Sequence, residues 1–157
     1  MGALYWQLND AWTSISWSSI DYYGNKKAFH YKLSEMYAPI LLGLDDAGND
    51  NYKLWICNDK QRDIDGRIRI VVEDMRGNQM FAFSEVVDVK ANSCYRFPKD
   101  IAINMTEKMK SDCYARIIFM EDDTVLSEKI HIFKYPKDMN FIETQLEPKV
   151  TFADGKY

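Results

Sequence analysis

The sequence predicts a mainly β protein whose central part is an antiparallel β-sandwich. From Ile40 onward, apolar residues recur with a period of two, as in strands that bury one face. No helical pattern interrupts these runs, and about seven strands separated by short turns are typical of an antiparallel sandwich. The residues expected to face the core are Tyr52, Leu54 and Ile56; Ile68, Ile70 and Val72; Phe81 and Phe83; Ile101 and Ile103; Ile117 and Phe119; and Ile130 and Ile132.

Polar clusters separate the predicted strands. They are rich in Asp, Asn and Gly, which adopt positive φ or hydrogen-bond their own backbone and therefore favour turns. The clusters cover residues 46–50, 58–60, 76–78, 91–93 and 121–123. The Cys–Trp–Cys pattern of antibody domains is missing, so the sequence indicates the sandwich architecture and nothing finer.

Residues 1–38 differ in composition from the rest of the chain. They contain three of the four tryptophans, Trp6, Trp12 and Trp17, and a serine-rich stretch over residues 14–19. Residues 3–8 are predicted to form a strand. Residues 25–37 are predicted to form a helix, because apolar residues recur there at spacings of three and four and Pro39 stops it. The apolar face of this helix is Phe29, Leu33, Met36 and Tyr37.

The overall composition excludes several classes of protein. With 157 residues, 46% of them hydrophobic, the chain can bury one sizeable core. The net charge is only -4 and the basic residues are scattered among acidic ones, which argues against a nucleic-acid partner. No stretch approaches the ~20 apolar residues that span a bilayer, so no membrane partner is expected. The first residues lack the features of a signal peptide, and the compartment is left unassigned.

The three cysteines have no diagnostic spacing. Cys57, Cys94 and Cys113 each fall in a strand-like run. We predict three buried free thiols, with a disulfide or a metal site as the alternatives.

Both ends of the chain have the pattern of interrupted domains. After a linker that starts near Tyr135, residues 149–152 read as a new strand, and the Asp154-Gly155 pair reads as a hairpin turn with little sequence after it. At the front, the strand over residues 3–8 leads directly into a tryptophan-rich surface of the kind that invites association. We therefore expect the chain to be a piece of a larger protein.

Three short motifs carry a resemblance to a known family. They are WQLNDAW at residues 6–12, SWSSIDYYG at residues 16–24 and KAFHY at residues 27–31. Together they closely resemble the end of the catalytic barrel in the β-mannosidases of glycoside hydrolase family 2. The chain departs from the family pattern at Thr13, where proline is usual, and at Ala11, where cysteine is common. The remainder resembles, more weakly, the immunoglobulin-like sandwich that follows the barrel in these enzymes.

The resemblance implies a division of the chain into three regions. Residues 1–38 would be the C-terminal edge of a (β/α)8 barrel, with the eighth strand at 3–8 and the eighth helix at 25–37. Residues 39–135 would be the immunoglobulin-like β-sandwich, and residues 136–157 a linker and the start of a truncated β domain. Trp6 would lie under the mannose ring of the substrate, since sugar C–H faces stack on indole. Asp10 and Trp12 would shape the same pocket. The alternative is that these aromatic residues only pack a core.

No catalytic residue, cofactor or metal site is predicted in this chain. Retaining hydrolysis needs two carboxyl groups about 5–5.5 Å apart. The resemblance places them on the fourth and seventh barrel strands, one within an Asn-Glu pair that this sequence lacks. His30 and His131 are expected to be structural, because neither has further ligands at metal spacing. The acidic residues near one another fall in predicted turns or in the linker and read as solvated: Asp45, Asp46, Glu121, Asp122, Asp123, Glu143 and Glu147.

These features favour a non-catalytic accessory fragment of a β-mannosidase whose parent removes terminal β-D-mannose with retention. Its expected partners are the remainder of the parent chain, the manno-oligosaccharide or glycan substrate of that parent, and further copies bound through the N-terminal aromatic residues. The tryptophans of residues 1–25 are expected to dock on the sandwich or on a second copy, or else the segment is disordered.

Two other functions remain open. One is an autonomous carbohydrate-binding β-sandwich module, with Tyr52, Trp55 and Tyr114 as candidate platform residues. The other is an immunoglobulin-like adhesion domain, which leaves the three motifs unexplained.

Overall fold

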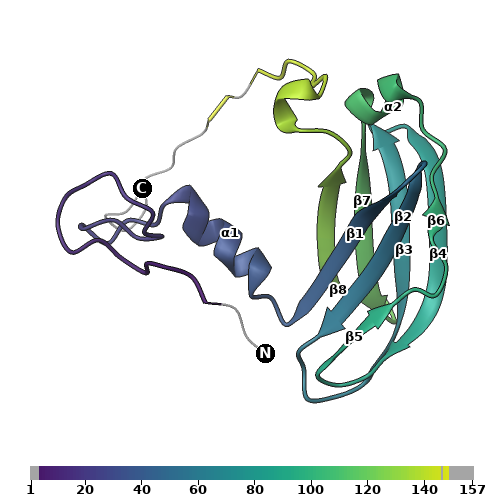
Figure 1. The fold of residues 1–157 in the computed structure, drawn as a ribbon, viewed down its shortest axis with the longest axis horizontal. Helices are drawn as coiled ribbons and strands as arrows, with labels where there is room; N and C mark the ends of the chain where they lie inside the picture. The colour runs from purple at the N-terminus through teal and green to yellow at the C-terminus, as the bar shows by residue number, and fades with distance from the viewer. Residues whose placement is uncertain (1–3, 146, 149–157) are drawn as a thin grey trace.

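The computed structural model of the chain describes residues 4–145, 147 and 148. Its centre consists of two antiparallel sheets packed face to face (Figure 1). The first sheet holds β1 (Ile40–Gly48), β2 (Asn51–Asn58) and β5 (Ser93–Arg96) in that order, and β6 (Ile101–Ala102) pairs with the other end of β2. The second sheet runs β4 (Gln79–Val89), β3 (Ile64–Asp74), β7 (Cys113–Glu121) and β8 (Thr124–Ile132). The predicted mainly β fold with an antiparallel sandwich is confirmed.

The core lies between the two sheets and follows the predicted alternation over most strands. Ile56 of β2, Ile70 of β3 and Ile117 of β7 are fully buried and belong to one apolar cluster. Each such side chain contributes about 1.5–3 kcal/mol on burial, so these rows hold the two sheets together. The inward rows predicted on β2, β3 and β7 are confirmed, whereas Phe81 and Phe83 on the edge strand β4 are only half-buried.

The predicted inward face of β8 is wrong. The antiparallel register aligns His131 and Lys129 with buried residues of β7, so these two share the core side. Ile130 faces outward and is 52% exposed. His131 contacts Tyr52 and Phe133 edge to face, at 6.2 and 5.2 Å between ring centroids. Burial, and next the charge of Lys129, lower the pKa of His131. Burial at this position therefore favours the neutral imidazole over the charged form.

The polar clusters predicted as turns lie at the ends of strands. Asn49, Asp50, Gly77, Asn92 and Asp122 all have positive φ, a region that Gly, Asn and Asp adopt at the lowest cost. The positions of these turns could therefore be predicted from the residue types.

Two of the three cysteines contradict the prediction of free thiols. Cys57 of β2 and Cys94 of β5 lie opposite each other in the sheet and form a disulfide, with 4.0 Å between their Cα atoms. This bridge joins neighbouring strands of one sheet, whereas the bridge of antibody domains joins the two sheets. Only Cys113 is free and buried, as predicted.

Helix α1 (Ala28–Met36) begins later than the predicted residue 25 and ends before Pro39 as expected. Of its predicted apolar face only Leu33 is buried. Tyr5 packs against Phe29 and Tyr37, at 5.8 and 6.4 Å between ring centroids, and covers part of that face. Most of this apolar face is therefore partly or fully exposed in the described residues.

Two short helical elements were not predicted. In α2 (Glu107–Asp112) the hydroxyl of the N-cap residue Thr106 accepts a hydrogen bond from the backbone N–H of Met109 at 3.2 Å. The 3-10 turn η1 (Pro136–Asp138) follows β8. Beyond it, the backbone N–H of Asn140 donates to the carbonyl of Ser111 at 2.8 Å, so the chain returns to α2. No helix in the described part of the chain is long and apolar enough to cross a membrane.

The strand predicted for residues 3–8 is not formed over residues 4–8, and residue 3 lies outside the described residues. The only pairing described there consists of isolated bridges from Ile20 to Asn9 and to Lys26. Figure 1 shows this segment beyond α1, on the side away from the sandwich, so its tryptophans do not dock on the sandwich as one expectation held. The strand predicted at residues 149–152 and the turn at Asp154 and Gly155 lie outside the described residues.

Candidate functional site

The three motifs lie side by side in space. The backbone N–H of Ile20 donates to the carbonyl of Leu8 at 2.9 Å, and that of Asp10 donates to the carbonyl of Ile20 at 3.1 Å. The backbone N–H of Lys27 donates to the carbonyl of Ser19 at 2.9 Å. Short pieces of backbone near residues 8–10, 18–20 and 26–27 therefore form one compact unit, which we call the motif segment (residues 4–27).

The interior of the motif segment is polar. Asp10 is only 6% exposed, and its carboxylate accepts from the Lys27 ammonium at 2.8 Å. Ser16 donates to the same carboxylate, and Lys27 also donates to the hydroxyl of Ser18 at 2.7 Å. The hydrogen bond from Lys27, and next that from Ser16, hold the pKa of Asp10 below its ordinary value. The structure thus places Asp10 inside the segment, as a paired carboxylate.

The exterior of the motif segment carries many large apolar side chains. Trp6, Trp12 and Trp17 are 75%, 71% and 68% exposed. With Leu4, Leu8 and Ile15, which are also exposed, they make up what we call the aromatic exterior. Six large apolar side chains exposed on one short segment are typical of a contact surface. Trp6 and Trp12, predicted from the resemblance as sugar contacts, are therefore accessible and do not pack a core within the described residues.

The sequence alone indicated no role for Lys27, Ser16 and Ser18 of the motifs. Lys27 lies 17 positions from Asp10 in the sequence. A pairing over that separation cannot be predicted from a local sequence pattern. The signal that could have found them is the occurrence of a lysine and serines in motifs that otherwise carry aromatic residues.

Three of the acidic residues in predicted turns have hydrogen-bond or ion-pair partners. Asp45 accepts from the indole N–H of Trp55 at 3.0 Å, and Asp46 accepts from the backbone N–H of Gly48 at 2.7 Å. Glu121 forms a two-pronged ion pair with Arg62, at 2.6 and 2.5 Å. These contacts stabilise turns and strand ends.

The aromatic residues of the alternative carbohydrate platform do not come together. Tyr52 is buried in the core. Trp55 lies on the outer face of the first sheet, and its indole covers Gly43. A Cβ atom added to Gly43 would lie only 1.9 Å from the indole, so the ring packs directly on the glycine. Tyr114 belongs to the second sheet and donates to Glu73 at 3.1 Å. The three rings therefore share no face.

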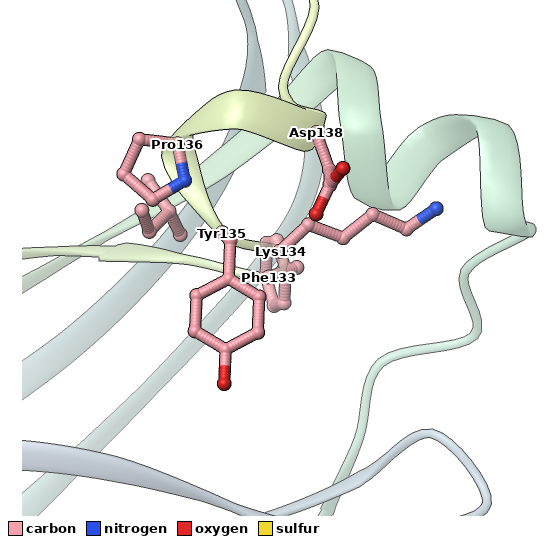
Figure 2. Close-up of a pocket in the computed structure, with 6 residues that line it drawn as sticks. Phe133, Lys134, Tyr135, Pro136 and Asp138 are labelled. Carbon is pink, nitrogen blue, oxygen red and sulfur yellow. The ribbon is translucent and has the colours of Figure 1, made fainter.

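Two hollows of the surface lie outside the motif segment. One of about 500 Å³ is lined only by residues 132–136 and 138, which come from one short stretch of the chain. Figure 2 shows its side chains spreading apart, with Tyr135 and Pro136 pointing in different directions. Another of about 450 Å³ lies between α1, β1 and β8 and includes Trp55. Neither hollow brings together a set of converging polar groups on the described residues.

The fold and the motif segment define an immunoglobulin-like β-sandwich preceded by a helix and, before that helix, a segment with exposed tryptophans. The family model described as "Mannosidase Ig/CBM-like domain" matches residues 50–138, which is more than half of the chain. The chain belongs to this family.

The relatives are β-mannosidases. Beta-mannosidase B of Aspergillus niger is 26% identical over 165 aligned positions, which cover 94% of this chain and 19% of that protein. The beta-mannosidase of Rattus norvegicus is 51% identical over 49 residues, which cover 31% of this chain and 6% of that protein. The resemblance inferred from the three motifs is confirmed, and the chain spans about a fifth or less of the length of these curated relatives.

A solved structure shares the fold. The beta-D-mannosidase of Dictyoglomus thermophilum superposes with a TM-score of 0.76 and 20% identity, over 87% of this chain and 16% of that one. The likeness confirms the sandwich architecture.

Proposed function

We propose that this chain is the accessory, non-catalytic C-terminal part of a β-mannosidase whose complete form hydrolyses terminal β-D-mannose with retention. The observation that carries the proposal is the alignment of 94% of the chain with only 19% of a β-mannosidase. On this proposal residues 1–38 complete the catalytic barrel, 39–135 form the supporting sandwich, and 136–157 lead into a further β domain.

The motif segment supports a contact role for residues 1–38. A polar interior with a tryptophan-rich exterior is the reverse of an ordinary globular loop, and burying that exterior against the remainder of the barrel would remove its apolar surface from water. Trp6 would then offer its indole to the C–H face of the mannose ring, and Trp12 would border the same pocket. Asp10 would act on this pocket by holding the loop.

The assignment of the catalytic pair to another part of the enzyme is tested with the chain alone. Incubation with an aryl β-mannoside should give no turnover above a buffer blank, since the acids described here serve turns and ion pairs. Sustained hydrolysis that copurifies with the chain and is lost on Asp45→Asn or Glu121→Gln substitution would refute the non-catalytic role.

The assignment to a larger enzyme is tested on the gene. Sequencing upstream of the Gly2 codon should reveal the earlier barrel strands, with one carboxylate in an Asn-Glu pair and a second on a later strand. An upstream sequence with no barrel pattern would refute the proposal. In the complete enzyme, Trp6→Ala should lower kcat/KM by about ten-fold or more, as expected for a lost stacking contact.

A further inference from the structure

The β-sandwich is closed along one side and open along the other. On the closed side β1 and β8 approach each other, and the Ser127 hydroxyl donates to the carbonyl of Ile40 at 3.0 Å. On the other side, a groove of about 500 Å³ lies between β4 and the stretch that connects β5 to β6. Figure 1 places β4 and β6 on the side of the sandwich away from α1, so this groove is remote from the motif segment.

The groove contains phenylalanine rings in fixed positions. Phe81 and Phe83 project inward from β4, and Phe97 comes from the stretch after β5. All three are half-buried and pack against the core. Phe83 and Phe97 meet edge to face at 6.2 Å between ring centroids. Because the core holds these rings, a ligand that stacks on them would not have to order them first.

The edge of the groove carries three charged residues. Glu85, Lys99 and Asp100 line it, and none of the three forms an ion pair or a side-chain hydrogen bond within the described residues. Glu85 stands opposite the fully buried Ile68 in the β3–β4 register, so it belongs to the inward row of β4. A carboxylate thus interrupts an otherwise apolar row at the point where the sandwich is open.

We propose that this groove binds a neutral pyranose oligosaccharide. The C–H face of a sugar ring is apolar and suits the phenylalanine rings, while its hydroxyl groups are donors that suit the free carboxylates of Glu85 and Asp100. Lys99 supplies a donor for a hydroxyl or ring oxygen. A hollow of about 500 Å³ falls in the range of about 300–1,000 Å³ usual for small-molecule sites.

An extended peptide added to the free edge of β4 fits the groove less well. An inward-pointing charge on an edge strand is one of the devices that discourage pairing with another strand, and Glu85 occupies that position. The same carboxylate can accept hydrogen bonds from a ligand rich in hydroxyl groups. The binding site goes beyond the accessory role proposed above and does not depend on it.

The test is a titration of the ¹⁵N-labelled chain with manno-oligosaccharides, followed by two-dimensional NMR. We expect saturable shifts centred on β4 and residues 97–102. Glu85→Gln and Asp100→Asn should each weaken binding by about ten-fold, because charged acceptors form hydrogen bonds roughly twice as strong as neutral ones. Asp123→Asn, an exposed carboxylate in the β7–β8 turn, is the matched control and should leave the affinity unchanged.

Three results would overturn the proposal. The first is the lack of any saturable shift. The second is binding that survives both groove substitutions but is abolished by Trp55→Ala or Trp6→Ala. The third is a response of the β4 amides to an extended apolar peptide and none to the saccharide. The variants remove charge from exposed side chains, and an unchanged spectrum in the free state would show that they fold.

Discussion

The pairing of Asp10 with Lys27 explains why a lysine and serines accompany the tryptophans of the motif segment. A carboxylate withdrawn from water is costly unless it is paired and hydrogen-bonded, and here it receives donors from Lys27 and Ser16. Lys27 also stands as the N-cap residue of α1. This one side chain therefore connects the interior of the motif segment to the helix that leads into the sandwich.

Loss of the Asp10 charge should loosen the motif segment. A carboxyl group whose pKa is lowered on folding stabilises the folded state above its ordinary pKa of 3.8, and that contribution is lost as the pH falls through the lowered value. We therefore expect the NMR signals of Ser18, Ser19 and Ile20 to change with acid below about pH 4, and Asp10→Asn to produce that change at neutral pH.

The control for this prediction is Glu35→Gln, which removes an exposed partner of Lys32 on α1. Exposed pairs of this kind contribute little, so its spectrum over residues 8–20 should match that of the unmodified chain. Identical acid responses of the unmodified chain and the Asp10→Asn variant would show that another group controls the segment.

At the scale of elements, the sequence predicted those strand faces that the hydrophobic period and the residue types determine. The rows of β2, β3 and β7 were correct because each strand is long and buries one face. The inward face of β8 was wrong because an edge strand can bury His131 and leave Ile130 in water, and only the register with β7 decides between them. Helix α2 was missed because six residues are too few for a helical period to show.

The disulfide between β2 and β5 should contribute to stability. It closes a stretch of 37 positions, and the loss of such a cross-link costs about 2–4 kcal/mol through the entropy of the unfolded chain. We expect the double variant Cys57→Ser/Cys94→Ser to unfold at lower denaturant than the unmodified chain. Amide protection in β5 should fall most, because the bridge no longer ties this short strand to β2.

The matched control is the response of both proteins to reductant. Dithiothreitol should lower the midpoint of the unmodified chain to that of the double variant and leave the variant unchanged, since Cys113 forms no bridge. Thiol titration of the unfolded, unreduced chain should find one free thiol. Three free thiols would support the original expectation from sequence and exclude the bridge.

At the scale of the whole molecule, the architecture was predictable and the surfaces were not. Alternation and turn residues predicted the sandwich, and the three motifs predicted the relation to β-mannosidases, which the family match to residues 50–138 confirms. Neither signal indicated that Asp10 would be inside and Trp6 outside the motif segment, because both stand in one motif with no alternation to separate them. The groove between β4 and the stretch that connects β5 to β6 could not be predicted either, since its two walls belong to different sheets and lie apart in the sequence.

The aromatic exterior should cause the isolated chain to self-associate. Exposed tryptophans lose unfavourable contact with water when two copies bury them, and sulfate strengthens this effect. Sedimentation velocity should show a concentration-dependent rise in mass, increased by ammonium sulfate, that Trp6→Ser/Trp12→Ser/Trp17→Ser abolishes. Tyr135→Ser/Phe141→Ser, which removes exposed rings elsewhere, is the control and should associate as the unmodified chain does. The opposite result, a monomeric control variant and an associating triple tryptophan variant, would contradict the prediction. It would place the surface through which copies associate near η1.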